Sequence, residues 1–276
     1  MSPKNPAASA AARPENPLGA LIRQWRATRG RSQLDLALEM GVSQRHLSFV
    51  ESGRSAPSRA LVAGLAQALE IPFRDRNALL LAAGFAPIHA DKPWDAAEMR
   101  TLNRALERML RQHEPFPAIV MDRWWNVLMT NAAAPRLFGS FIDLAALPRQ
   151  RNLLRLMFDP KAMRPFVANW DAVARGLFER ISRESTGGVI DEKTRALIAE
   201  LLAYPEVTAD WGVIDQPGAA PVIPVGFVRD GRVLNYFSMV STVGTPQTIA
   251  AQELRVECMF PADDATEEWH LASFGA

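Results

Sequence analysis

A short run of side chains after Gly41 has the chemistry needed to read the edges of base pairs. Arginine can donate two hydrogen bonds to guanine, glutamine can pair similarly with adenine, and an apolar ring can cover a thymine methyl. Arg45, Gln44 and Phe49 bring these three chemistries into one short segment. We expect the outward-facing residues of this segment to be Ser43, Gln44, Arg45, His46, Ser48 and Phe49.

Groups suited to phosphate surround this segment. Gln33, at the first turn of the preceding predicted helix, can place its side-chain amide and its backbone N–H against a phosphate. Arg54 and Arg59 flank a loop that would lie along the sugar-phosphate backbone. Such contacts position a protein on nucleic acid without reading sequence. Four further arginines add to the positive electrostatic potential of this region: Arg23, Arg26, Arg29 and Arg31. The complete set of predicted DNA-binding residues is Gln33, Ser43, Gln44, Arg45, Ser48, Phe49, Arg54 and Arg59.

Five short helices are predicted to position these groups. Apolar residues recur at helical spacing over residues 18–30, 33–40, 43–51, 59–69 and 74–83. Ser32 and Ser43 are suitable N-caps, and Gly41 permits a tight turn between the second and third helices. The second helix is expected to bury Leu34, Leu36, Ala37 and Met40, and the third to bury Val42, Leu47 and Val50. This is the arrangement of a helix-turn-helix.

Charge is divided unevenly along the chain. Residues 1–86 contain 11 Lys or Arg and 6 Asp or Glu, whereas the remainder contains 20 basic and 24 acidic residues. A basic N-terminal part on a mildly acidic remainder favours a polyanionic partner at the N-terminus.

Composition restricts the remaining possibilities. The 276 residues are 48% hydrophobic and 22% charged, with a net charge of +1, which is unlike a disordered protein. The one cysteine, Cys258, excludes a disulfide framework and is expected to be a buried, inert thiol. Residues 1–17 are expected to be a disordered leader, and no apolar run is long enough to span a membrane. We therefore expect a cytoplasmic protein.

The second part of the chain is predicted to be a mixed α+β domain. After a linker at 87–94, the pattern predicts a helix over 95–113, strands at 118–121 and 125–130 that form a hairpin, and a helix over 131–139. Helical patterns follow at 152–184 and 191–202, and strands at 222–228, 233–243 and 252–260 close the chain. A sheet with helices across one face leaves room for an apolar pocket. Its candidate lining residues are Met121, Leu128, Phe158, Trp170, Phe178, Phe227 and Phe237, although aromatic and methionine residues at such spacings are more often ordinary core.

No catalytic or metal-binding pattern is found. The four histidines are not at metal-ligand spacing, and GxSxG, GxGxxG and the P-loop are missing. The acidic pairs Asp263-Asp264 and Glu267-Glu268 are expected to be solvated surface. We predict that the protein is not an enzyme, binds no metal and has no cofactor other than a bound apolar ligand.

Residues 18–86 resemble the lambda-repressor-like, XRE-type helix-turn-helix family. The matching residues are Ser32-Gln33, Leu36-Ala37, Gly41-Val42-Ser43, Leu47-Ser48, Glu51-Ser52-Gly53 and Pro57. The resemblance implies that Gln33 contacts phosphate and that Gln44, Arg45, Ser48 and Phe49 face the major groove. Phe49 departs from the polar residue more usual at its position.

Residues 95–272 resemble the MmyB-like ligand-binding domain. The resemblance is carried by His113-Glu114-Pro115, Pro117-Ala118-Ile119-Val120, Trp125-Asn126-Val127, Asn131-Ala132-Ala133, Leu137-Phe138, Asn152-Leu153-Leu154-Arg155 and Phe158-Asp159-Pro160. It implies a PAS-like fold over residues 95–276 that holds a long-chain fatty acid or a similar apolar molecule.

Together these features predict a regulator that binds operator DNA as a homodimer and senses a small apolar ligand. The alternatives are an adaptor whose C-terminal domain binds another protein and, less favoured, a DNA-targeted enzyme. An exposed apolar patch would favour the adaptor, and turnover that depends on the acidic pairs would favour the enzyme.

Overall fold

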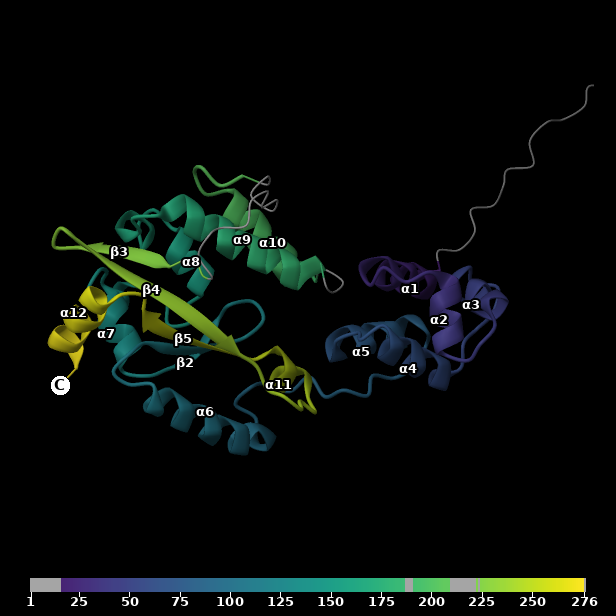
Figure 1. Cartoon of the computed structure of the whole chain (residues 1–276). Helices are drawn as coiled ribbons and strands as arrows, with labels where there is room; N and C mark the ends of the chain where they lie inside the picture. Colours follow the sequence, from purple (N-terminus) through teal and green to yellow (C-terminus); the bar gives the residue numbers. More distant parts are fainter. Residues whose placement is uncertain (1–15, 187–190, 209–221, 223, 276) are drawn as a thin grey trace, which may run out of the picture. The chain divides into compact units, whose positions relative to one another are not determined.

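The computed structural model describes residues 16–186, 191–208, 222 and 224–275, so nearly all of the predicted leader at 1–17 lies outside the described residues. The chain separates into two compact units (Figure 1). The first comprises the chain up to Ile71 together with Asp75–Ile88, and the second comprises Pro72–Arg74 and His89–Ala276.

The first unit is all-helical. Its helices are α1 (Pro17–Thr28), α2 (Gln33–Glu39), α3 (Gln44–Glu51), α4 (Arg59–Ala68) and α5 (Phe73–Ala82), so all five predicted helices are confirmed. The N-cap hydroxyls of Ser32, Ser43 and Ser58 each accept a hydrogen bond from the backbone N–H three residues later. These local caps explain why the helices could be placed from sequence.

A glycine turn joins α2 to α3. Gly41 has a φ of 65°, a backbone conformation that suits glycine, and the Val42 N–H donates to the carbonyl of Ala37 at 3.0 Å. Leu36, Ala37, Leu47 and Val50 are buried in the shared core of the unit. The prediction that Leu34 is buried was wrong, because on a helix it lies on the side away from Leu36, and it is 49% exposed.

The second unit is built on one antiparallel sheet of five strands. The strands are β1 (Ala118–Met121), β2 (Val127–Thr130), β3 (Val225–Arg229), β4 (Arg232–Ser241) and β5 (Arg255–Pro261), in the order β2-β1-β5-β4-β3 (Figure 1). The predicted hairpin and the three strands predicted at the end of the chain therefore belong to one sheet. They join because β1 pairs with β5, with Ala118 opposite Cys258.

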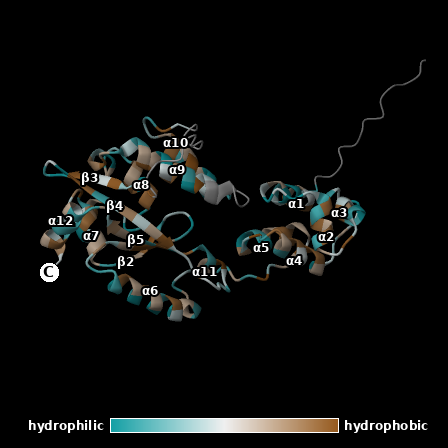
Figure 2. Cartoon of the chain, viewed as in Figure 1, coloured by the Kyte–Doolittle hydropathy of each residue, from teal (hydrophilic) through white to brown (hydrophobic). Residues whose placement is uncertain are grey.

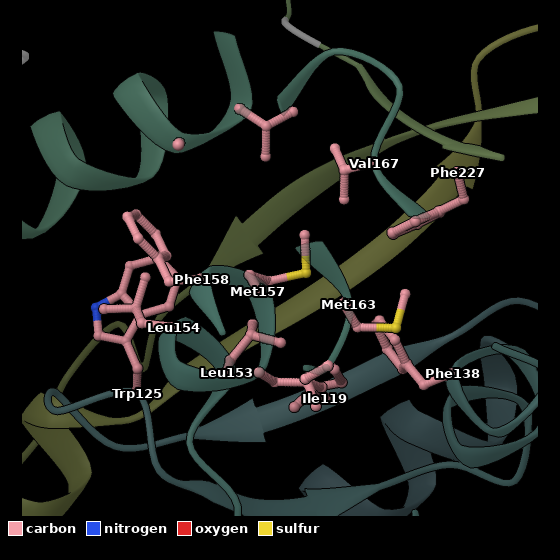
Figure 3. Packing of buried hydrophobic residues seen from close by; sticks show 14 of the residues in the cluster. Ile119, Trp125, Phe138, Leu153, Leu154, Met157, Phe158, Met163, Val167 and Phe227 are labelled. Atoms are coloured by element: carbon pink, nitrogen blue, oxygen red, sulfur yellow. The ribbon is translucent and has the colours of Figure 1, made fainter. Parts of the chain in front are cut away.

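Helices cover both faces of this sheet. On one face lie α7 (Ala133–Gly139), α8 (Leu153–Phe158), α9 (Trp170–Thr186) and α10 (Glu192–Leu202), and their buried side chains form the main core with Ile119, Met121, Phe227 and Tyr236 (Figure 3). On the other face α6 (Arg100–Gln112) packs Leu106 and Leu110 against Ala118 and Val120.

The sequence pattern misplaced several elements of this unit. The predicted helix at 152–184 is broken into α8, the 3-10 turn η3 (Arg164–Phe166) and α9, and the break begins at Asp159-Pro160, as expected where proline follows. The helix predicted from residue 95 begins later, with the 3-10 turn η1 (Ala97–Met99) before α6. Two helices, α11 (Ile249–Glu253) and α12 (Asp264–Phe274), and a further 3-10 turn, η2 (Leu144–Ala146), were not expected.

Candidate nucleic-acid interface

Helix α3 places its polar and apolar residues on opposite sides. Leu47 and Val50 are buried in the core of the first unit, whereas Ser43, Gln44 and Arg45 are exposed. His46, Ser48 and Phe49 are half-buried. The outward-facing groups predicted from sequence are thus accessible on the surface that the caps of α3 hold in place.

Two arginines contact the Phe49 ring. The guanidinium carbon of Arg45 lies 5.2 Å from the ring centroid and that of Arg54 lies 5.8 Å from it. Cation–π contacts of this kind are attractive, and they restrict the arginine rotamers. Phe49 therefore brings together one predicted base-reading residue and one predicted phosphate-contacting residue.

A buried carboxylate lies behind this surface. The Glu51 side chain is 2% exposed and accepts hydrogen bonds from Arg26 Nε at 2.7 Å, Arg26 Nη2 at 3.1 Å and Gln33 Nε2 at 2.7 Å. The Gln33 amide thus donates one N–H to Glu51, and no hydrogen bond within the described residues uses its second N–H. Sequence reasoning missed Glu51 because a charged residue next to Ser52-Gly53 is typical of an exposed helix end.

Several arginines that were expected to supply positive field make structural hydrogen bonds. Arg23 donates to the carbonyl of Glu51, Arg29 donates to the carbonyls of Leu69 and Glu70, and Arg31 pairs with Glu39. Arg59 remains exposed while one of its N–H groups donates to the carbonyl of Ala86. These bonds fix the helix ends from which the exposed groups project.

The seven residues predicted to line a ligand pocket do not come together. Met121, Phe158, Phe178 and Phe227 are buried in the main core, and Figure 3 labels Phe158 and Phe227. Half-buried Trp170 packs against this core, with its ring centroid 5.2 Å from that of Phe158. Leu128 and Phe237 lie on the opposite sheet face, because successive strand residues alternate in direction. The structure therefore does not bring all seven to one cavity, and their part in ligand binding stays a prediction.

A hollow of about 180 Å³ opens beside the main core, where Leu156 and Ala162 belong to both. The Nε of Arg151 is buried and has no hydrogen-bond partner among the residues that the structure describes, while Nη2 donates to the carbonyl of Leu144 at 2.9 Å. A buried guanidinium N–H without an acceptor is costly, so an acceptor supplied by a ligand would be favourable there. The hollow is lined by Leu147, Pro148, Gln150, Arg151, Asn152, Arg155, Leu156, Asp159, Ala162 and Tyr204.

Three titratable groups of the second unit, Cys258, His270 and Asp263, have structural roles. Cys258 is buried on β5, where burial first and the neighbouring Glu257 second raise its pKa, so the thiol is held in its uncharged form. Burial lowers the pKa of His270, whose two ring nitrogens each lie 2.8 Å from a partner, the Tyr236 hydroxyl and the Pro115 carbonyl. Asp263, the first residue of one acidic pair, is the N-cap of α12, and its carboxylate accepts hydrogen bonds from Thr266 N and Asn235 Nδ2.

The described residues contain neither a candidate metal-binding cluster nor a candidate membrane-spanning helix. No group of three or more His, Cys, Asp or Glu side chains there could hold a metal ion. Within the same ranges, no helix has the length and apolar character needed to cross a membrane.

Comparisons with known proteins agree with this division into two parts. A family model described as helix-turn-helix matches residues 22–75, and one described as "MmyB-like transcription regulator ligand binding domain" matches residues 102–272. No curated protein matches the chain. The structure titled "Structure of an RNA-binding Light-Oxygen-Voltage Receptor" is similar over 93% of this chain and 61% of its own, at 12% identity and a TM-score of 0.26, so the chain spans about three-fifths of that protein's length. Because the ligand-binding family model covers more than half of the sequence, the chain belongs to the MmyB-like transcription regulators and is a DNA-binding regulator with a ligand-binding domain.

Proposed function

We propose that the protein is a sequence-specific regulator that binds operator DNA in the cytoplasm as a homodimer, and acts by binding and not by catalysis. The observation that carries this proposal is the orientation of α3. Its apolar residues Leu47 and Val50 are buried and leave Gln44 and Arg45 exposed at the N-terminal end of the helix, the end that enters the major groove in this motif.

Each of the predicted DNA-binding residues has a proposed role. Arg45 pairs with guanine, Gln44 with adenine, and Phe49 contacts a thymine methyl. Gln33, Arg54 and Arg59 contact phosphates and fix the register of α3 in the groove. Ser43 and Ser48 complete the surface that faces the bases.

The test is the Arg45→Ala variant of the full chain. Sequences selected from random DNA by the wild-type protein define the operator, and fluorescence anisotropy then measures affinity for that duplex and for duplexes altered at one position. We expect the variant to lose about 1–3 kcal/mol of preference at one base position and little elsewhere. The matched control is Arg31→Ala, at an exposed arginine paired with Glu39. An equal loss on selected and random DNA would show that Arg45 contacts only phosphate.

The homodimer follows from the small number of base pairs that one such helix can read. Two half-sites spaced by one helical turn, about 34 Å, would supply the missing specificity. The outward face of β3 and β4 supports self-association, because Val228, Val233 and Met239 are exposed on it and Met239 is 60% exposed. We expect light scattering to give a dimer mass for the wild-type chain and a monomer mass for Met239→Glu. A dimer mass for both would place the interface elsewhere.

The ligand is proposed to be a small apolar molecule such as a fatty acid. The support is the interior around Met121, Phe158 and Phe227, with the hollow beside it in which Arg151 could meet a carboxylate. Ligand would favour one arrangement of the two C-terminal domains in the dimer and so change the spacing of the DNA-binding units. By linkage, DNA changes the affinity for the ligand by the same factor.

Native mass spectrometry of gently purified protein tests the ligand proposal. We expect a bound mass in the range of a long-chain acid, and we expect Arg151→Gln to bind dodecanoate more weakly while binding of dodecanol is unchanged. Protein that carries no bound molecule and fails to bind either compound in titration would refute the proposal.

A further inference from the structure

The helix α6 presents a row of arginines to solvent. Arg100, Arg104, Arg108 and Arg111 recur at intervals of four, four and three residues, which places them within about 80° of one another around the helix axis. All four are exposed. Hydrophilic and hydrophobic positions alternate along α6 in Figure 2, as expected for a helix with one buried side. We call these four residues the α6 ridge.

One acidic side chain shares the face of the α6 ridge: exposed Glu107, three residues after Arg104 and four before Arg111, which forms no ion pair with any residue that the structure describes. The side chains of Arg104, Arg108 and Arg111 form no hydrogen bond or ion pair with any residue that the structure describes. Arg100 donates Nε to the carbonyl of Ala97 and lies near Glu98, whose carboxylate is already bonded to Lys92. The ridge therefore carries positive charge that no ion pair among the described residues neutralises.

The opposite side of α6 is fixed to the sheet. Leu106 and Leu110 are buried against β1, and a ring nitrogen of His113, just after the helix, lies 2.8 Å from the carbonyl of Met259. Because these contacts set the rotation of α6 about its axis, the ridge points away from its own domain. With four arginines and one glutamate, this face carries net positive charge on a rigid element, which suits a polyanion.

We propose that the α6 ridge is a second DNA contact, which binds phosphates beside the half-site read by α3. The inference rests on the proposed function, since the first unit must bring DNA to the protein. From Arg100 to Arg111 the helix rises about 16 Å, which is the axial length of about five phosphates on one strand. The nine residues from Ile88 to Ala96, before η1, can extend at most about 30 Å, which is close to one turn of duplex.

The chemistry favours DNA over an acidic protein surface. Met109 is the one large apolar side chain of α6 that is exposed among the described residues, at 38%, and it borders the buried side of the helix. Protein-binding helices bury an apolar centre, whereas phosphate contacts require only cationic groups at suitable spacing. Guanidinium groups bind phosphate in two-pronged geometry.

The test measures how DNA affinity depends on salt for the full chain. The probe is a fluorescein-labelled duplex of random sequence and about 40 base pairs, roughly four helical turns. The variant is Arg104→Gln, Arg108→Gln and Arg111→Gln together. The matched control removes the same charge from exposed side chains of the same unit, with Arg136→Gln, Arg149→Gln and Lys161→Gln.

Three lost phosphate contacts reduce the slope of log affinity against log salt by about 2.7. Between 50 and 200 mM salt, the wild-type affinity should then fall by a factor about 40 times larger than that of the ridge variant. The control should keep the wild-type slope, and thermal unfolding should show all three proteins folded. A ridge variant with the wild-type slope, or one that changes only as much as the control, would overturn the inference. Failure of the wild-type chain to bind DNA at all would instead refute the proposed function.

Discussion

Glu51 offers the sharpest test of how the DNA-binding unit is held together. Its carboxylate accepts three hydrogen bonds, two from Arg26 and one from Gln33, and the Arg26 side chain is only 16% exposed. Glu51→Ala would leave the Arg26 guanidinium largely desolvated and without its anion. Removing one partner of a buried pair costs about 3–5 kcal/mol, because the remaining charge is uncompensated.

The double variant separates the pair from the packing around it. Arg26→Ala alone leaves a buried carboxylate with Gln33 as its remaining side-chain donor, so it should also destabilise the unit. Glu51→Ala with Arg26→Ala removes both charges, and its cost should fall well short of the sum of the single costs. We expect a coupling free energy of about 2 kcal/mol or more.

Amide hydrogen exchange of the full chain, followed by mass spectrometry, measures this effect unit by unit. A loss of 3–5 kcal/mol corresponds to exchange that is about 100-fold to several thousand-fold faster. Peptides from α1 to α4 should show it, and peptides from the five strands should not. A loss below about 1 kcal/mol for Glu51→Ala, or additive single effects, would refute the reasoning.

Two further predictions concern close packing and pH. A Cβ at Gly19 would lie 2.0 Å from the Glu51 carbonyl oxygen, so Gly19→Ala should lower stability by about 1–3 kcal/mol, and an unchanged melting temperature would contradict this. Because burial lowers the pKa of His270, the unfolded chain takes up this proton first as pH falls below about 6.5. The neutral ring, which can accept from the Tyr236 hydroxyl while donating to the Pro115 carbonyl, thus stabilises the second unit above that pH and less so below it. The urea midpoint should drop between pH 7.5 and 5.5, and should drop less in His270→Gln; a midpoint that rises on acidification would contradict the sign.

The first unit could be predicted well because its signals are local. Ser32, Ser43 and Ser58 cap helices within three residues of themselves, and Gly41 marks a turn that only a few residues define. Glu51 could not be predicted in the same way. Its burial depends on Arg26, which lies 25 residues away in the sequence.

The second unit was harder because its elements depend on distant partners. The pairing of β1 with β5 joins segments more than 130 residues apart. The sequence alone therefore could not distinguish one five-stranded sheet from a hairpin and a separate three-stranded sheet. Met121 pairs with Val127, which places Leu128 on the opposite face of the sheet. The predicted pocket lining included both Met121 and Leu128, although side chains alternate between the two faces along a strand. The charged start of α12 is typical of solvated surface, yet Asp263 caps a helix that buries His270.

The central claim is that the N-terminal end of α3 enters the DNA groove, and photo-crosslinking tests it most directly. A photo-reactive amino acid replaces Gln44 in one protein and Leu81, an exposed residue of α5, in another. Both proteins are irradiated on the selected operator duplex. We predict a DNA adduct from position 44 and none from position 81. Equal adducts from both positions, or none from position 44 in a protein that still binds the duplex, would contradict the account.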